Sequence, residues 1–74
     1  MRQVIKPEQL EVLMGIYSER DLPLPTREAV RMRIVNGATY EWCEMMTGVS
    51  RQRIAKAVDK LEQAHEKIKT VYGL

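Results

Sequence analysis

The chain has little of the chemistry that most enzymes use. Among its 74 residues there is one cysteine, Cys43, and one histidine, His65, far apart in the sequence. A single cysteine forms no intramolecular disulfide, and one cysteine with one histidine falls short of a structural zinc site. There is also no Ser-His-Asp set and no glycine-rich phosphate loop. We therefore expect a protein that is not an enzyme, with no cofactor, no metal and no small-molecule ligand.

Long apolar runs are missing as well. The sequence contains no stretch of the length that spans a bilayer. Its first ten residues, MRQVIKPEQL, lack the apolar segment of a signal peptide. We expect a cytoplasmic protein without membrane contact. Residues 1–74 suffice for one domain, and a core this small is often completed by a partner subunit.

Strand patterns are absent too, because β-branched residues never alternate over a strand length. The chain is predicted to be all-α, with about four helices. The expected helices run from Pro7 to Ser18, from a cap at Thr26 to the NG pair at 36–37, from a cap at Thr39 through Met46, and from a cap at Ser50 without interruption to Gly73.

Apolar residues at helical spacing predict the core. The predicted core positions are Leu10, Leu13, Met14 and Tyr17; Ala29, Val30 and Ile34; Trp42, Cys43 and Met46; and Ile54, Val58, Leu61, His65, Ile68 and Tyr72. The last group alternates steps of four and three residues, which is typical of a helix seam. Trp42 is expected to pack against the first helix. Cys43 is interpreted as a small buried residue rather than a nucleophile.

The sequence does carry an excess of positive charge near its C-terminus. The net charge is only +2, yet residues 51–74 carry six basic and three acidic side chains. The segment 48–61, GVSRQRIAKAVDKL, opens this region and has the pattern of a helix-turn-helix. Gly48 permits a sharp turn, Val49 closes the corner, and Ser50 caps the second helix.

This pattern leaves polar side chains on the outer face of the second helix. Arginine can bind guanine, glutamine can bind adenine, and lysine prefers phosphate. The predicted DNA-binding residues are Ser50, Arg51, Gln52, Arg53, Lys56 and Lys60. One residue departs from the pattern: Glu44 stands where close helix packing favours a small side chain. Either Glu44 is angled out at the rim, or the register is displaced by one residue.

The segment 35–61 resembles the PapB-type regulators of fimbrial adhesin operons. The shared features are a glycine before the first motif helix, a Cys-Glu pair inside it and a closing Lys-Leu step, here Gly37, Cys43–Glu44 and Lys60–Leu61. The segment is also similar to the KorA (TrfB-like) plasmid repressors, through Val35–Gly37 and Gly48–Ser50–Arg51. The similarity covers roughly residues 8–62 and leaves both families open.

Both resemblances imply a bacterial, helical, sequence-specific transcription regulator or repressor that binds duplex DNA as a dimer or higher oligomer, and so lies at the nucleoid when bound. The PapB-type pattern also has glutamate at the position of Glu44. This chain needs one extra residue at the turn relative to that family. Residues 51–53 therefore cannot be equated one by one with that family's DNA-reading side chains.

The C-terminal extension, residues 62–74, continues beyond the motif and carries apolar residues. A free apolar stripe on a helix normally finds a partner. His65, Ile68, Val71 and Tyr72 are therefore predicted to form a self-association surface, which would place two recognition helices about 34 Å apart on DNA. The alternative for this segment is that it folds back on the first helix. His65 is interpreted as a half-exposed packing residue, and an interface pH sensor is the other option for it.

Two other functions compete with a sequence-specific regulator. One is a protein-interaction adaptor, and the other is an architectural or partition protein that binds DNA with little sequence preference. A DNA-binding measurement over a range of salt concentrations separates the three.

Overall fold

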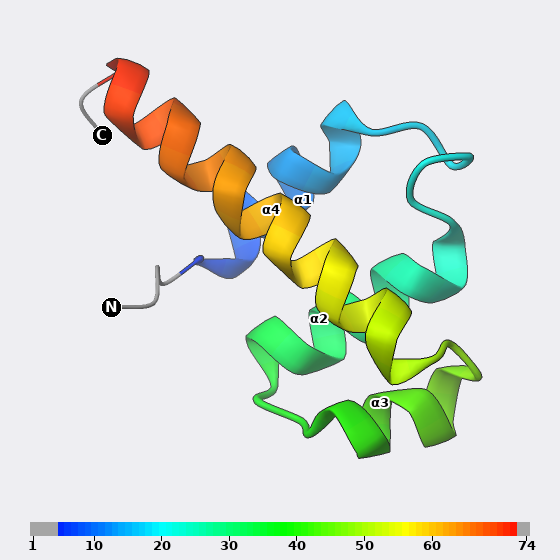
Figure 1. Cartoon of the computed structure of the whole chain (residues 1–74). Helices are drawn as coiled ribbons and strands as arrows, with labels where there is room; N and C mark the ends of the chain where they lie inside the picture. The colour runs from blue at the N-terminus through cyan, green and yellow to red at the C-terminus, as the bar shows by residue number, and fades with distance from the viewer. Residues whose placement is uncertain (1–4, 73–74) are drawn as a thin grey trace.

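The computed structural model describes residues 5–72, which form four helices and no strand (Figure 1). The helices are α1 (Pro7–Ile16), α2 (Leu24–Val35), α3 (Tyr40–Thr47) and α4 (Arg51–Tyr72). The predicted all-helical class and number of helices are confirmed. The 22 residues of α4 span about 33 Å at the rise of an α-helix, so this helix sets the longest dimension of the molecule, 37 Å.

Helix α4 crosses the other three helices (Figure 1). α2 contacts all three of its neighbours, whereas α1 and α3 each pack on α2 and α4 and not on each other. The core is made of Ile5, Leu10, Leu13, Met14, Leu22, Ala29, Val30, Cys43, Val49, Ile54, Ala57, Val58 and Leu61. Each large apolar side chain among them contributes roughly 1.5–3 kcal/mol on burial, so most of the stability resides where the four helices meet.

Local signals in the sequence set several helix ends as predicted. Pro7 occupies the first turn of α1, where its missing N–H has no partner to lose. The Thr39 hydroxyl accepts the Trp42 N–H at 3.1 Å, and Gly37 and Gly48 both adopt positive φ, 70° and 77°. The Ser50 hydroxyl accepts the Arg53 N–H at 3.3 Å. Caps and left-handed glycines thus work as expected.

Three helix boundaries differ from the predictions. α1 ends at Ile16 rather than Ser18, because the Ser18 hydroxyl donates to Asp21 at 3.2 Å and belongs to the following loop. The cap at Thr26 is wrong: α2 begins at Leu24, and Thr26 lies buried in its first turn. Pro25 fits there since first-turn N–H groups have no helical partner. α3 extends one residue further, to Thr47.

Part of the predicted core is also wrong. Trp42 is 48% exposed and Met46 is 58% exposed, so neither packs against α1. The short helix α3 buries Cys43 alone, because α2 and α4 both lie on one side of it. At the end of α4, Tyr72 is 72% exposed. Ile54, Val58 and Leu61 are buried as predicted, and Ala57 joins them.

Candidate nucleic-acid interface

The junction between α3 and α4 is a tight, well-bonded corner formed by residues 48–50. Gly48 ends α3 in the left-handed conformation and donates its N–H to the Glu44 carbonyl at 2.8 Å. Val49 is buried and its N–H donates to the Thr47 hydroxyl at 3.3 Å. The Ser50 cap then starts α4. The three residues therefore hold the first turn of α4 at a fixed position beside α3.

Glu44 lies at the rim, the first of the two alternatives for this residue. One of its carboxylate oxygens accepts the backbone N–H of Arg51 at 3.0 Å. The other lies 3.4 Å from Arg51 Nε, while Glu41 lies 3.3 Å from Arg51 Nη1. Glu44 thus satisfies a donor that helix geometry leaves unpaired at the start of α4. Arg51 is tied to α3 by two carboxylates, so it is not a free outward cation.

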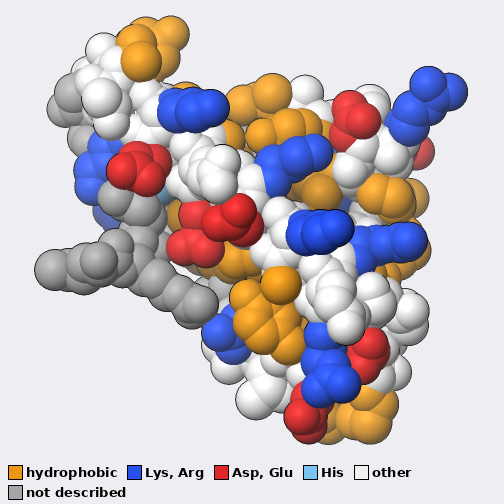
Figure 2. Space-filling model, viewed as in Figure 1, with side chains coloured by type: hydrophobic (Ala, Val, Ile, Leu, Met, Phe, Trp, Pro, Cys, Tyr) orange, Lys and Arg blue, Asp and Glu red, His pale blue; other side chains and the backbone are white. Residues whose placement is uncertain are grey.

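The exposed polar side chains on the first half of α4 include Gln52, Arg53, Lys56 and Lys60. The three cations follow each other at steps of three and four residues, which places them on one side of the helix. Figure 2 shows Lys and Arg side chains in a row along α4. The acidic residues Asp59, Glu62 and Glu66 repeat the same spacing on a different side. These three acidic residues therefore lie on a different flank of α4 from Arg53, Lys56 and Lys60.

The predicted self-association residues fall into two groups. His65 and Ile68 are half-buried in a groove against α1, where Val12 and Leu13 form the opposite wall. Val71 is 75% exposed and Tyr72 is 72% exposed. His65 and Ile68 therefore fold back on α1, as the alternative prediction has it. Val71 and Tyr72 remain exposed, as expected of a free apolar stripe. Residues 73–74 of the predicted extension lie outside the described residues.

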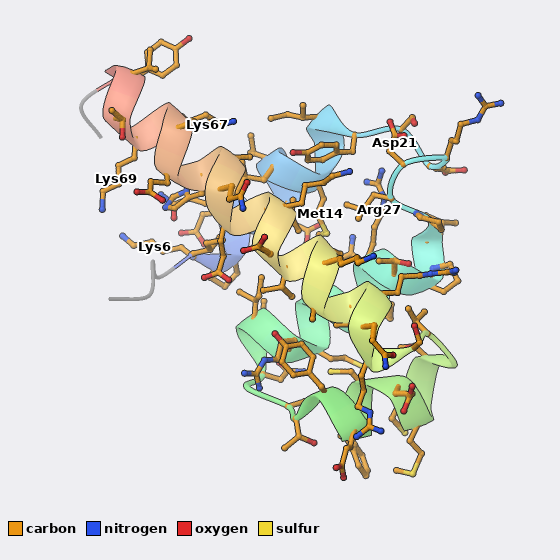
Figure 3. All side chains as sticks on the ribbon, in the orientation of Figure 1. Lys6, Met14, Asp21, Arg27, Lys67 and Lys69 are labelled. Atoms are coloured by element: carbon orange, nitrogen blue, oxygen red, sulfur yellow. The ribbon has the colours of Figure 1, made fainter. Side chains whose placement is uncertain are left out.

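Sequence reasoning missed Arg27. Its guanidinium donates three hydrogen bonds, to the carbonyls of Leu22 at 2.7 Å, Met14 at 2.9 Å and Tyr17 at 2.7 Å. Figure 3 shows Arg27 between Met14 and the loop that carries Asp21. The side chain therefore binds the end of α1, the connecting loop and the start of α2 together. No local sequence signal marks this role, because the partners are carbonyl groups.

Arg33 has a similar role on the other side of α2. It donates to the Ala38 carbonyl at 3.0 Å, and its guanidinium lies 4.4 Å from the centre of the Tyr40 ring. These contacts fix the connection from α2 to α3, and with it the placement of α3. Arg27 and Arg33 thus fix the two connections on either side of α2.

Cys43 is fully buried in the core. Burial raises the pKa of the Cys43 thiol above its ordinary value, since the thiolate would lose its solvation. The protonated thiol is a weak nucleophile, and only the thiolate reacts readily. Cys43 therefore serves packing.

Within residues 5–72, no helix has both the length and the apolar character needed to cross a bilayer. The same part of the chain holds no group of three or more side chains arranged to bind a metal ion. Comparison with known proteins finds no family model, no curated protein and no solved structure that matches the chain. The resemblance to PapB-type and KorA regulators accordingly rests on the residues quoted for it.

Proposed function

We propose that the chain is a sequence-specific DNA-binding transcription regulator that reads the major groove with the first half of α4. The observation that carries this proposal is the exposed set Gln52, Arg53, Lys56 and Lys60 at the start of a helix that α3 holds in place. A helix-turn-helix made of α3, residues 48–50 and α4 presents such a row to base edges and phosphates. The resemblance to fimbrial and plasmid regulators supports a bacterial repressor acting in the cytoplasm at the nucleoid.

The proposed roles follow from side-chain chemistry and exposure. Gln52 and Arg53 have the donor and acceptor groups that read adenine and guanine. Lys56 and Lys60 supply charge to phosphates. Arg51 acts differently, because Glu41 and Glu44 already engage its guanidinium. Its role is to position the first turn of α4 rather than to contact a base.

The test begins with selection of bound duplexes from a randomised DNA pool, followed by titrations at several salt concentrations. A sequence-specific regulator binds the selected duplex about 10³-fold or more tightly than a scrambled one, and both affinities fall steeply with salt. Equal affinity for the two duplexes indicates an architectural or partition protein. No binding to any duplex at low salt overturns the proposal and favours a protein-interaction adaptor.

Arg53→Ala examines the reading face directly. In each half-site, we expect it to cost about 1–3 kcal/mol of binding free energy and to relax the preference at one base pair. Lys67→Ala is the matched control, since it removes one charge from an exposed site two helical turns beyond Lys60 on the same helix. Equal affinities of the Arg53→Ala and Lys67→Ala proteins for the selected duplex would refute the placement of α4 in the groove.

We also propose that the regulator is a homodimer paired through the end of α4. The supporting observation is that Val71 and Tyr72, two apolar side chains in the last turn of α4, are 75% and 72% exposed. Exposed apolar side chains grouped at the end of a helix commonly mark contact sites. Sedimentation at tens of micromolar should give a dimer for the wild type and a monomer for Val71→Asp. A monomeric wild type without DNA rejects this interface.

A further inference from the structure

A groove lies between α4 and the loop that joins α1 to α2. Arg20, Asp21 and Leu22 line it from the loop, and Arg53, Lys56 and Lys60 line it from α4. Four of these six side chains are cations, contributed by two elements far apart in the sequence. Arg53 and Lys56 belong also to the proposed reading face, so the groove continues that face toward the loop.

The loop that forms one wall of the groove is fixed by burial and by hydrogen bonds. Leu22 is 2% exposed, and its N–H donates to the Ser18 carbonyl at 2.8 Å. Arg27 holds the carbonyls of Leu22 and Tyr17 from inside. Arg20 is an exposed arginine on this fixed loop, so its backbone is in place before a ligand binds. The entropy lost when the loop is ordered on binding is therefore smaller.

The charges around the groove favour an anion. The one carboxylate on the wall, Asp21, accepts a hydrogen bond from the Ser18 hydroxyl and so faces back to its own loop. The Lys60 ammonium lies 5.1 Å from the centre of the Tyr17 ring, beside the groove. Arg27 lies behind the loop and adds a further positive charge. Its hydrogen bonds within the described residues go to neutral carbonyls, so they do not neutralise that charge. Clustered cations with one engaged carboxylate give a positive local potential.

We propose that this groove binds a backbone phosphate of duplex DNA, held by Arg20 from the loop and by Lys56 and Lys60 from α4. The inference rests on the proposed function, since it takes the reading face of α4 to lie on DNA. A duplex whose bases meet Gln52 and Arg53 has its sugar-phosphate backbone at the edge of that contact, where the groove opens. Arg20 is then a DNA contact outside the helix-turn-helix, and it contributes affinity without sequence preference.

The test compares Arg20→Ala and Lys60→Ala with Lys67→Ala on the selected and scrambled duplexes. Lys67 lies on the distant part of α4, well away from Asp21 and the loop (Figure 3). We expect Arg20→Ala to weaken both duplexes by the same factor and to reduce the salt slope by about 0.9 for each half-site that the protein occupies. For each such contact, the loss of affinity seen at 50 mM salt should shrink about threefold at 200 mM. The preference for the selected duplex should stay unchanged.

A second measurement locates the contact. Selected duplexes that carry one neutral methylphosphonate at successive positions are titrated with wild type and with Arg20→Ala. At the phosphate held in the groove, the methylphosphonate weakens DNA binding by wild type. It weakens binding by the Arg20→Ala protein much less, because that protein already lacks the partner charge. Arg20 is exposed, and circular dichroism of the variants checks that they are folded.

The outcomes separate this inference from the proposed function. Specific binding by wild type together with an Arg20→Ala protein that behaves like Lys67→Ala rejects the groove as a phosphate site and leaves the reading face standing. An Arg20→Ala protein that loses preference for the selected duplex also overturns it, since Arg20 then contacts a base. If wild type binds no duplex, the proposed function and this inference both fail.

Discussion

The two halves of α4 belong to one helix and have different surroundings. In the first half, Ile54, Ala57, Val58 and Leu61 are buried beneath α2, α3 and the end of α1. In the second half, His65 and Ile68 are only half-buried, and Val71 and Tyr72 extend into solvent. Figure 1 shows the last turns of α4 reaching past the other helices.

The difference indicates a division of labour along one helix. A side chain that reads a base must be held to within about half an ångström, and neighbouring packing provides that. A surface that pairs with a second copy gains from being exposed and apolar before the partner arrives. The first half has the support that a binding face needs, and the second half has the exposure that a partner contact needs.

Amide hydrogen exchange tests the difference between the two halves of α4 most directly. Amides of Val58 and Leu61 should exchange only on global unfolding, which for a chain of this size costs about 3–5 kcal/mol. Amides of residues 70–72 should exchange with an opening free energy close to zero, because the last turn of a helix frays and few apolar contacts cover it. Protection of the last turn that rises with protein concentration would support dimer pairing there. Uniform protection at low concentration would contradict the contrast between the halves.

A pair of matched deletions comes next. Leu61→Ala removes a side chain that is fully buried, and it should cost about 2–5 kcal/mol of unfolding free energy. Ile68→Ala removes a similar apolar group from a half-buried site and should cost only about 1 kcal/mol. Urea denaturation of both variants beside wild type measures the difference. Equal losses would mean that the second half is packed as firmly as the first.

Local signals made the helix ends of this chain largely predictable. Thr39, Gly48 and Ser50 each act through atoms within a few residues, so their roles can be read without the fold. Thr26 misled because it precedes an apolar stripe as a cap does, whereas two prolines upstream start the helix earlier. A capping residue inside the first turn looks the same in sequence as one at its beginning.

The core and the candidate site depended more on tertiary neighbours. The apolar residues of α3 spread over most of its circumference, so its sequence offers no narrow stripe, and only the structure shows that Cys43 is the buried one. The pairing of Arg51 with Glu41 and Glu44 was open to prediction, since two glutamates three residues apart face the same way just before the turn. The bonds of Arg27 to carbonyls and the position of Arg20 beside α4 required the fold.

The link between α3 and α4 gives a smaller predicted effect. Glu44→Ala removes the carboxylate that accepts the Arg51 N–H, and the loss should be about 1 kcal/mol, as for other helix caps. Glu41→Ala removes only an ion pair whose carboxylate is 80% exposed, so its effect should stay within about 0.5 kcal/mol. Thermal melts of the two variants compare them. A larger loss for Glu41→Ala would show that the ion pair, and not the backbone cap, holds the start of α4.

The smallest predicted effect concerns α1, which covers the second half of α4 and is itself tied to α2 by a surface ion pair. Arg31 Nε and Nη2 lie 2.8 and 3.0 Å from the two carboxylate oxygens of Glu11. The Arg31 hydrogen bonds hold the pKa of Glu11 below its ordinary value of about 4.5, against a partly opposing effect of burial. Because the folded pKa is the lower one, the pair stabilises the fold above pH 4.5 and loses its contribution as pH falls through the folded value.

Both side chains of this pair are well exposed, at 39% and 53%, so the contribution should stay below about 1 kcal/mol and shrink in high salt. Wild type should therefore melt slightly above Glu11→Gln at pH 7, and the two curves should converge near pH 3. Glu8→Gln, which alters an exposed carboxylate on the same helix, provides the control for charge alone. A difference between wild type and Glu11→Gln that persists unchanged at pH 3 would mean that Glu11 stabilises α1 through packing rather than through its charge.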